Sequence, residues 1–169
     1  MIRKAVPADL VQIEKVLEAV KADMQKNNID QWDSEYPNKE ILNRDIQSQV
    51  GWVSDENGEI ISYMVLNESC DEEYNLLRWK YASPFLIIHR LFVSPSAQGK
   101  GVSSTMIKYA EQYAFENNYH SIRLDAFSLN ETANVVYLKK GYELVGTVTF
   151  RKGIFNCYEK AIHSNHLQK

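Results

Sequence analysis

Apolar residues recur at helical spacing in two segments of the chain, and Pro37 and Gly141 mark the start of one further helix and the end of another. In the first, from Leu10 to Met24, they stand on one face of a helix that Pro7 and Asp9 would open. The last helix is stopped by Gly141, which stands where a C-terminal helix cap is expected. The pattern therefore predicts four helices, at about 10–24, 37–50, 102–117 and 131–140.

Strand-like runs fill most of the chain between these helices. The stretch 51–66 holds two such runs around a turn cluster at 55–58, which predicts a hairpin. The run FLIIHRLFV (85–93) is almost continuously apolar, as a strand buried on both faces should be. A polar, partly aromatic connection (67–83) joins the two. Further strands are predicted at 1–6, at 121–127 and in two runs around the turn 151–153.

The order β-α-α-β-β-β-α-β-α-β-β predicts an α/β fold with a mixed sheet and helices on both faces. Residues 85–127 would form a βαβ unit, whose parallel strands are joined by a right-handed crossover. Ligands of such folds bind beyond the carboxyl ends of the parallel strands. The segment SPSAQGKGVS (94–103) occupies that position, so binding chemistry is expected there.

Composition narrows the class of protein without indicating an activity. The 169 residues are 44% hydrophobic and 24% charged, which is typical of a single globular domain, here 1–169 with a short polar tail from about 163. The formal net charge of −3 gives no general attraction for nucleic acid. No apolar run is long enough to span a membrane and the N-terminus is too polar for a signal peptide, so we expect a cytoplasmic protein. Cys70 and Cys157 form neither a disulfide framework nor a ligand cluster, and we expect two unpaired thiols and no metal.

Two glycines, Gly99 and Gly101, stand between a predicted strand and a predicted helix, where backbone amides can approach a phosphate. A P-loop requires a lysine followed by Ser or Thr, but Gly101 follows Lys100, and Ser94 replaces the first glycine. A dinucleotide-binding loop requires a third glycine where Ser104 stands. Neither nucleotide motif fits, which leaves a ligand of another class or a simple glycine turn.

The loop instead resembles the acyl-CoA loop of the GNAT superfamily of N-acetyltransferases, whose pattern is (R/Q)-x-x-G-x-(G/A). Here the pattern reads Gln98, Gly99, Lys100, Gly101, Val102 and Ser103, with Ser103 in place of the last Gly or Ala. Family members also carry N-x-x-A-x-x-x-Y-x-K-x-G-(F/Y) after the next strand. This second pattern is present in full as Asn130, Ala133, Tyr137, Lys139, Gly141 and Tyr142.

The resemblance extends over residues 2–162, and the segments IDQW…YPN and IIHRLFVSP are similar to a group of small bacterial GNAT proteins. It implies the GNAT fold, a mixed and mostly antiparallel sheet with one parallel pair of strands at the CoA site. It also implies an N-acetyltransferase that moves the acetyl group of its co-substrate, acetyl-CoA, to a primary amine of a small molecule, peptide or protein. Because neither a Cys nor a Ser is set up as a nucleophile, transfer would be direct, in a ternary complex.

Two further hypotheses stay open beside this one. A catalytically silent acyl-CoA sensor or regulatory module is the alternative function, since the usual catalytic carboxylate of the central strand is replaced by Ile87. A homodimer is compatible with the resemblance, because family members often pair through exposed sheet edges and the late hairpin, here 142–162.

The resemblance assigns the donor site to two parts of the chain. Backbone amides from Gln98 to Ser104 suit the CoA pyrophosphate, and the strand 91–93 would bond the pantetheine arm. Asn130 stands where the family contacts the CoA arm, and it can also cap the following helix. The predicted donor-binding residues are Leu91, Phe92, Val93, Gln98, Gly99, Lys100, Gly101, Val102, Ser103, Ser104, Asn130, Ala133 and Tyr137.

For catalysis, Tyr137 is the predicted general acid, because a phenol near the thioester can protonate the departing thiolate. The alternative is a tyrosine that only packs in the core. His89 lies on the same strand face as Leu91 and is the predicted base, although a histidine in an apolar strand is more often structural, and water can also carry the amine proton.

Aromatic residues in and near the polar loop 27–38 are the candidates for the acceptor side. Trp32 and Tyr36 are predicted to bind the hydrocarbon part of an amine, with Trp52 as a further candidate. The alternative is that these rings only attach the loop to the core.

Overall fold

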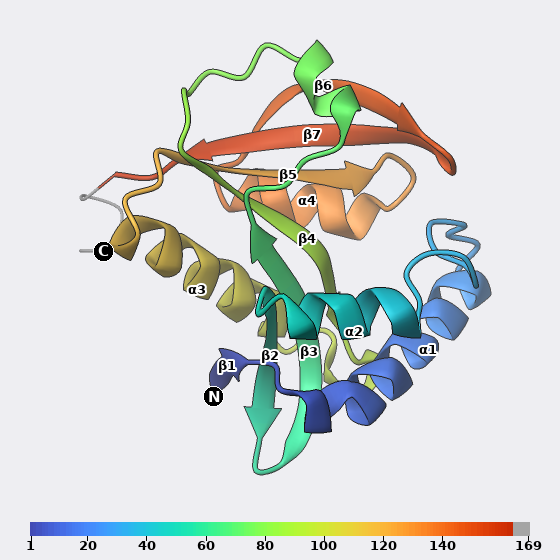
Figure 1. Cartoon of the computed structure of the whole chain (residues 1–169). Helices are drawn as coiled ribbons and strands as arrows, with labels where there is room; N and C mark the ends of the chain where they lie inside the picture. The colour runs from blue at the N-terminus through green and yellow to red at the C-terminus, as the bar shows by residue number, and fades with distance from the viewer. Residues whose placement is uncertain (164–169) are drawn as a thin grey trace. The chain divides into compact units, whose positions relative to one another are not determined.

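The computed structural model describes residues 1–163, so all but the first residue of the predicted polar tail lies outside it. Seven strands form one sheet in the order β1-β2-β3-β4-β5-β7-β6 (Figure 1). Strands β4 and β5 are parallel, whereas β1–β2, β2–β3, β5–β7 and β7–β6 are antiparallel pairs. The predicted mixed α/β fold, with a parallel pair inside a mostly antiparallel sheet, is confirmed.

Contacts within the chain divide it into two units, and β4 (Phe85–Val93) and α3 (Val102–Glu116) contribute to both. Unit 1 comprises 1–66 and 89–109, and unit 2 comprises 67–88 and the chain from 110 onward. None of the helices described in 1–163 has the length and apolar character that crossing a membrane requires.

Unit 1 is built from the N-terminal helices and a hairpin. Its elements before residue 67 are β1 (Ile2–Lys4), η1 (Pro7–Asp9), α1 (Leu10–Lys26), α2 (Lys39–Gln47), β2 (Gly51–Glu56) and β3 (Glu59–Asn67). Asn57 and Gly58 form the hairpin turn with φ of 55° and 90°, the conformation that Asn-Gly turns favour. The core between these elements includes fully buried Ile13, Leu17 and Leu42. Ile13 and Leu17 belong to the apolar pattern that predicts the first helix.

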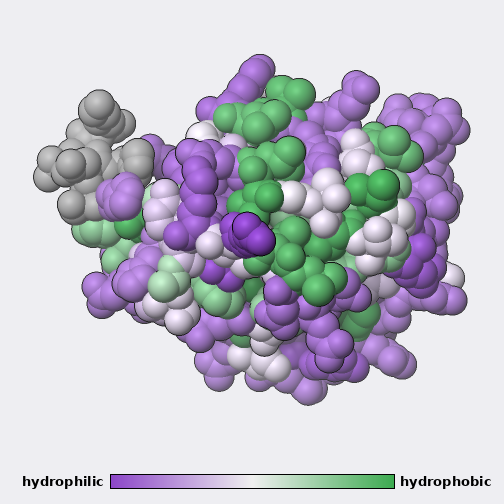
Figure 2. Space-filling model, turned by 90° about the horizontal axis from the view of Figure 1, so that it is seen from above, coloured by the Kyte–Doolittle hydropathy of each residue, from purple (hydrophilic) through white to green (hydrophobic). Residues whose placement is uncertain are grey.

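Unit 2 holds the second half of the chain. Its further elements are η2 (Glu72–Leu76), β5 (Ser121–Phe127), α4 (Glu131–Lys139), β6 (Glu143–Phe150) and β7 (Gly153–Ala161). Helix α4 ends before Gly141, whose φ of +87° suits the predicted C-terminal cap. On the face seen in Figure 2, exposed apolar side chains form a band. The large apolar residues that unit 2 exposes include Leu76, Leu144 and Ile154.

The connection 67–83 differs from its prediction, because it contains the 3-10 helix η2. The side chain of Tyr74 is only 2% exposed, and its hydroxyl donates to Asp125 Oδ2 over 2.5 Å. Trp79 Nε1 in turn donates to the Tyr74 carbonyl over 2.8 Å. The aromatic residues of this polar segment therefore attach it to β5, through contacts 51 residues apart that no local pattern reveals.

Candidate active site

The glycine loop between β4 and α3 has the backbone that an anion-binding loop requires. Gly99 and Gly101 adopt φ of +77° and +79°, a region that residues with a side chain rarely occupy. A Cβ at either position would meet no atom within 4 Å, so conformation rather than crowding requires glycine. The first hydrogen bond of α3 runs from Thr105 N to Gly101 O over 3.0 Å. The preceding helical amides, of residues 102–104, therefore have no acceptor inside the helix.

The end of β4 lies directly before this loop in unit 1. Phe92 and Val93 are 3% and 8% exposed, and Leu91 is half-buried. Gln98 Nε2 donates to the Val93 carbonyl over 3.1 Å, which attaches the loop to the strand. Strand and loop thus form one continuous structure at the predicted donor position, with residues 98–101 exposed.

The predicted acceptor residues have different environments. Trp32 is 7% exposed and its ring packs edge-on against Phe92, with 5.8 Å between ring centroids. Trp52 is 8% exposed and contacts Tyr109. These two rings therefore attach their segments to the core of unit 1. Tyr36 is 39% exposed, so it is the one of the three that presents a substantial surface to a ligand.

Helix α4 carries the second set of predicted residues, all in unit 2. Asn130 Oδ1 accepts from Ala133 N over 3.2 Å, which confirms the predicted N-terminal cap. Tyr137 is 9% exposed, and its ring lies 6.0 Å from those of Tyr142 and Tyr158. Within residues 1–163, its hydroxyl forms no hydrogen bond with another side chain or with the backbone. Burial, helped by Asp125 and Tyr158, raises the pKa of Tyr137, so the phenol holds its proton at neutral pH.

Asp125 of β5 is a candidate that the sequence reasoning missed. It is partly accessible, and Tyr74 donates to its Oδ2. Burial raises the pKa of Asp125 to about 6. The Tyr74 hydrogen bond lowers this pKa and the charge of Asp71 raises it, both by less than burial does. Its cross-strand neighbour is Cys157, whose pKa burial raises to about 12. A carboxyl group that titrates near neutral pH can exchange protons with a substrate.

His89 is half-buried on β4 and belongs to unit 1 with the glycine loop and the predicted acceptor residues. Asn130, Ala133, Tyr137 and Asp125 belong to unit 2. Unit 1 thus contains His89, the glycine loop and the predicted acceptor residues, and unit 2 contains the predicted residues of α4. Both cysteines are free thiols, Cys70 exposed and Cys157 buried, as predicted.

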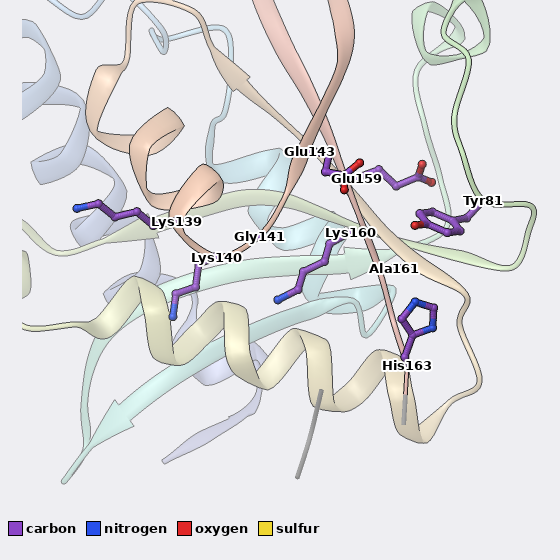
Figure 3. Close-up of a pocket in the computed structure, with 9 residues that line it drawn as sticks. All are labelled: Tyr81, Lys139, Lys140, Gly141, Glu143, Glu159, Lys160, Ala161 and His163. Carbon is purple, nitrogen blue, oxygen red and sulfur yellow. The ribbon is translucent and has the colours of Figure 1, made fainter. Parts of the chain in front are cut away.

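An open pocket of about 450 Å³ lies entirely in unit 2 and is separate from the predicted residues (Figure 3). It is lined by Tyr81, Lys139, Lys140, Gly141, Glu143, Glu159, Lys160, Ala161 and His163. Its carboxylates already have partners, since Glu159 accepts from Arg123 and Ser121, and Glu143 pairs with Lys80. In Figure 3 the side chains of Lys139 and Lys140 point in different directions instead of converging. This pocket is therefore not the predicted site.

Comparison with known proteins identifies the family. The sequence model of the acetyltransferase (GNAT) family matches residues 14–142. The chain belongs to the GNAT acetyltransferase family. GNAT proteins use an acyl-CoA as co-substrate and transfer its acyl group to an acceptor. The resemblance that the two sequence motifs indicated is confirmed, and the matched range includes the glycine loop, Asn130 and Tyr137.

Solved structures of other GNAT proteins have the same fold. A GNAT acetyltransferase of Streptococcus agalactiae is 26% identical, with a TM-score of 0.86 over 97% of this chain and 96% of the other. A protein of Staphylococcus aureus assigned to the acetyltransferases is also 26% identical, with a TM-score of 0.77 over 96% and 99%. Ard1 of Thermoplasma volcanium shares the fold alone, at 15% identity and a TM-score of 0.74 over 97% and 98%. No protein of the curated set matches the chain significantly.

Proposed function

We propose that this GNAT protein transfers the acetyl group of acetyl-CoA to a primary amine by direct attack in a ternary complex. The amine nitrogen would attack the thioester carbon, the C–S bond would break, and coenzyme A would leave as a thiolate that takes up a proton. Acetyl-CoA is the proposed co-substrate, and the amine belongs to a small molecule, a peptide or a protein.

The donor side of the proposal rests on the glycine loop. The positive φ of Gly99 and Gly101 and the unsatisfied amides at the start of α3 suit the pyrophosphate of coenzyme A. Leu91, Phe92 and Val93 would bond the pantetheine arm through their backbone. On the acceptor side, Tyr36 has the exposure that contact with an amine requires, whereas Trp32 would support the loop from behind.

Tyr137 carries the catalytic part of the proposal. It combines a buried ring with a protonated hydroxyl that has no hydrogen-bond partner within residues 1–163. A tyrosine that only packed in the core would be expected to satisfy its hydroxyl. An ordinary thiol has a pKa of about 8.5, below that of this phenol. Tyr137 would therefore first donate a hydrogen bond to the developing thiolate and release its proton as the C–S bond breaks.

Asp125 is the proposed base. Above a pH of about 6 its carboxylate can accept the proton that the amine loses, and it belongs to the same unit as Tyr137. His89 stays the alternative base, with water as the third possibility. Substitutions separate them, because Asp125→Asn and His89→Gln would each abolish the contribution of one group only.

The test measures binding and turnover separately. Wild-type protein should be stabilised thermally by acetyl-CoA and should release free thiol with a reactive member of an amine panel. Tyr137→Phe should lose at least 100-fold in turnover and keep its acetyl-CoA affinity, because only the proton donor is removed. Tyr142→Phe is the matched control, since that ring is also buried next to Tyr137, and its hydroxyl donates to Glu111 instead.

Each outcome bears on a different part of the proposal. Unchanged turnover in Tyr137→Phe would exclude the acid role. Binding of acetyl-CoA without thiol release across a broad panel would favour the sensor module over the enzyme. The absence of any thermal shift would show that acetyl-CoA is not the donor.

A further inference from the structure

Arg90 has an unusual backbone conformation within β4. Its φ is +47°, whereas the other residues between 1 and 163 with positive φ and a side chain are Asn28, Gln49, Asn57 and Asn118, all in turns or at helix ends. Asparagine tolerates this region and arginine does not, so glycine would be the relaxed choice at position 90. Such a strained residue persists only where the surrounding structure holds it in place.

The side chain of Arg90 bonds two partners from distant parts of unit 1, Asp45 and Tyr36. Its Nε donates to Asp45 Oδ2 over 2.9 Å and its second terminal nitrogen to Asp45 Oδ1 over 2.6 Å, which makes a two-pronged ion pair. Its other terminal nitrogen donates to Tyr36 Oη over 3.0 Å. The Tyr63 hydroxyl also donates to Asp45 Oδ2, over 2.9 Å. Burial lowers the pKa of Arg90, but Tyr36 and Asp45 raise it by more, so the guanidinium stays charged.

This cluster includes residues from both the predicted acceptor side and the predicted donor side of unit 1. Tyr36 lies in the loop before α2 that is predicted to contact the acceptor, and Asp45 lies on α2 itself. Arg90 directly precedes Leu91, the first residue of the strand segment proposed to hold the acyl arm. A second connection runs in parallel, because Phe92 packs against both Trp32 and Tyr63. The acceptor loop, residues 29–38, thus contacts the donor strand through Tyr36 on Arg90 and through Trp32 on Phe92.

We propose that Arg90 is a positioning residue that holds the acceptor loop, residues 29–38, against the donor strand through Asp45 and Tyr36. The inference rests on the proposed function for its kinetic consequence only. The guanidinium does not touch the reacting atoms. It sets the place of Tyr36 relative to Leu91, and therefore the place of an acceptor that contacts Tyr36.

Hydrogen exchange of the ligand-free protein tests the holding role without acyl-CoA or acceptor. In Tyr36→Phe, which removes the hydroxyl that Arg90 bonds and leaves the Arg90–Asp45 pair intact, amides of residues 29–38 should exchange at least threefold faster. Arg90→Gly, which also relieves the strained backbone, should accelerate exchange at least tenfold. Arg90→Lys, which keeps the charge but lacks the fork, should fall between wild type and Arg90→Gly. Arg3→Gln is the matched control, because Arg3 also forms a two-pronged ion pair with one carboxylate in unit 1, that of Asp9, and bonds Asp55 in addition.

Kinetics test the consequence for the acceptor. The acceptor KM of Tyr36→Phe and Arg90→Gly should rise about three- and tenfold, while the acetyl-CoA Kd changes less than twofold. Unchanged exchange in 29–38, or a loss of acetyl-CoA affinity with an unchanged acceptor KM, would overturn the proposal. If wild-type protein proves to have no turnover, the proposed function fails, and the exchange rates alone decide whether Arg90 holds the loop. If Arg90→Gly does not fold, Tyr36→Phe gives the same decision.

Discussion

Replacing Asp125 by asparagine should stabilise this protein and inactivate it. Burial and the charge of Asp71 favour the neutral form of the Asp125 carboxyl group and outweigh the hydrogen bond from Tyr74, which favours the carboxylate. Asparagine has nearly the same shape and can still accept the Tyr74 hydrogen bond. The substitution therefore removes the charge and little else.

The size of the effect follows from the pKa of Asp125, which is raised from an ordinary 3.8 to about 6. A difference of roughly two pKa units corresponds to about 3 kcal/mol, at 1.36 kcal/mol for each unit. Because the raised pKa belongs to the folded state, Asp125 contributes fully to the free energy of unfolding below pH ~4. This contribution is lost as the pH rises through about 6. An asparagine side chain does not titrate, so the stability advantage of Asp125→Asn should grow by up to about 3 kcal/mol between pH 4 and 7.5.

Urea unfolding followed by tryptophan fluorescence at several pH values measures this difference. Asp55→Asn is the control, because the Gly58 amide and Arg3 lower the pKa of Asp55, and its difference from wild type should stay flat between pH 4.5 and 7.5. Turnover should fall 100-fold or more in Asp125→Asn, and the wild-type rate should rise with pH through about 6. A stability difference that does not change with pH, or that favours the wild type increasingly as pH rises, would refute the reasoning.

Two further substitutions test the donor residues. Gly101→Ala should raise the acetyl-CoA Kd about tenfold and lower the free energy of unfolding by about 1 kcal/mol, because a φ of +79° is unfavourable for alanine. Calorimetry measures both effects. The control is Gly58→Ala in the hairpin turn, where φ is +90°, and it should lose the same stability with unchanged affinity. Asn130→Ala should cost about 1 kcal/mol in thermal unfolding through the lost cap, which Asn130→Asp should restore. If Asn130 also contacts the CoA arm, Asn130→Asp will still bind acetyl-CoA more weakly than wild type, and full recovery of affinity would leave it as a cap alone.

The order of elements was predictable because it depends on local rules. Apolar spacing predicted α1 and α3, and the turn at Asn57-Gly58 predicted the hairpin of β2 and β3. Strands β4 and β5 have the bounds that their apolar runs predict. The connection 67–83 was predicted less well, since the burial of Tyr74 depends on a partner far along the chain.

The candidate site was predictable in part for the same reason. The glycine loop and the cap of α4 are contiguous motifs, whose backbone requirements are visible in the residues themselves. Tyr137 was predicted from its spacing in the second motif, and the structure adds its burial and its unpaired hydroxyl within the described residues. The roles of Asp125 and Arg90 were missed, although an arginine within an almost continuous apolar run is a signal that a buried carboxylate pairs with it.

By itself, the sequence determined the family, the element order and the position of the donor loop, because each depends on residues close together in the chain. Tertiary structure alone decided which charges are enclosed and by what. Arg90 meets Asp45 across 45 residues, and Asp125 meets Tyr74 across 51. The pKa of a carboxyl group and the conformation that a strained residue can maintain depend on such neighbours and on the water that they exclude. Those neighbours are set by the path of the whole chain.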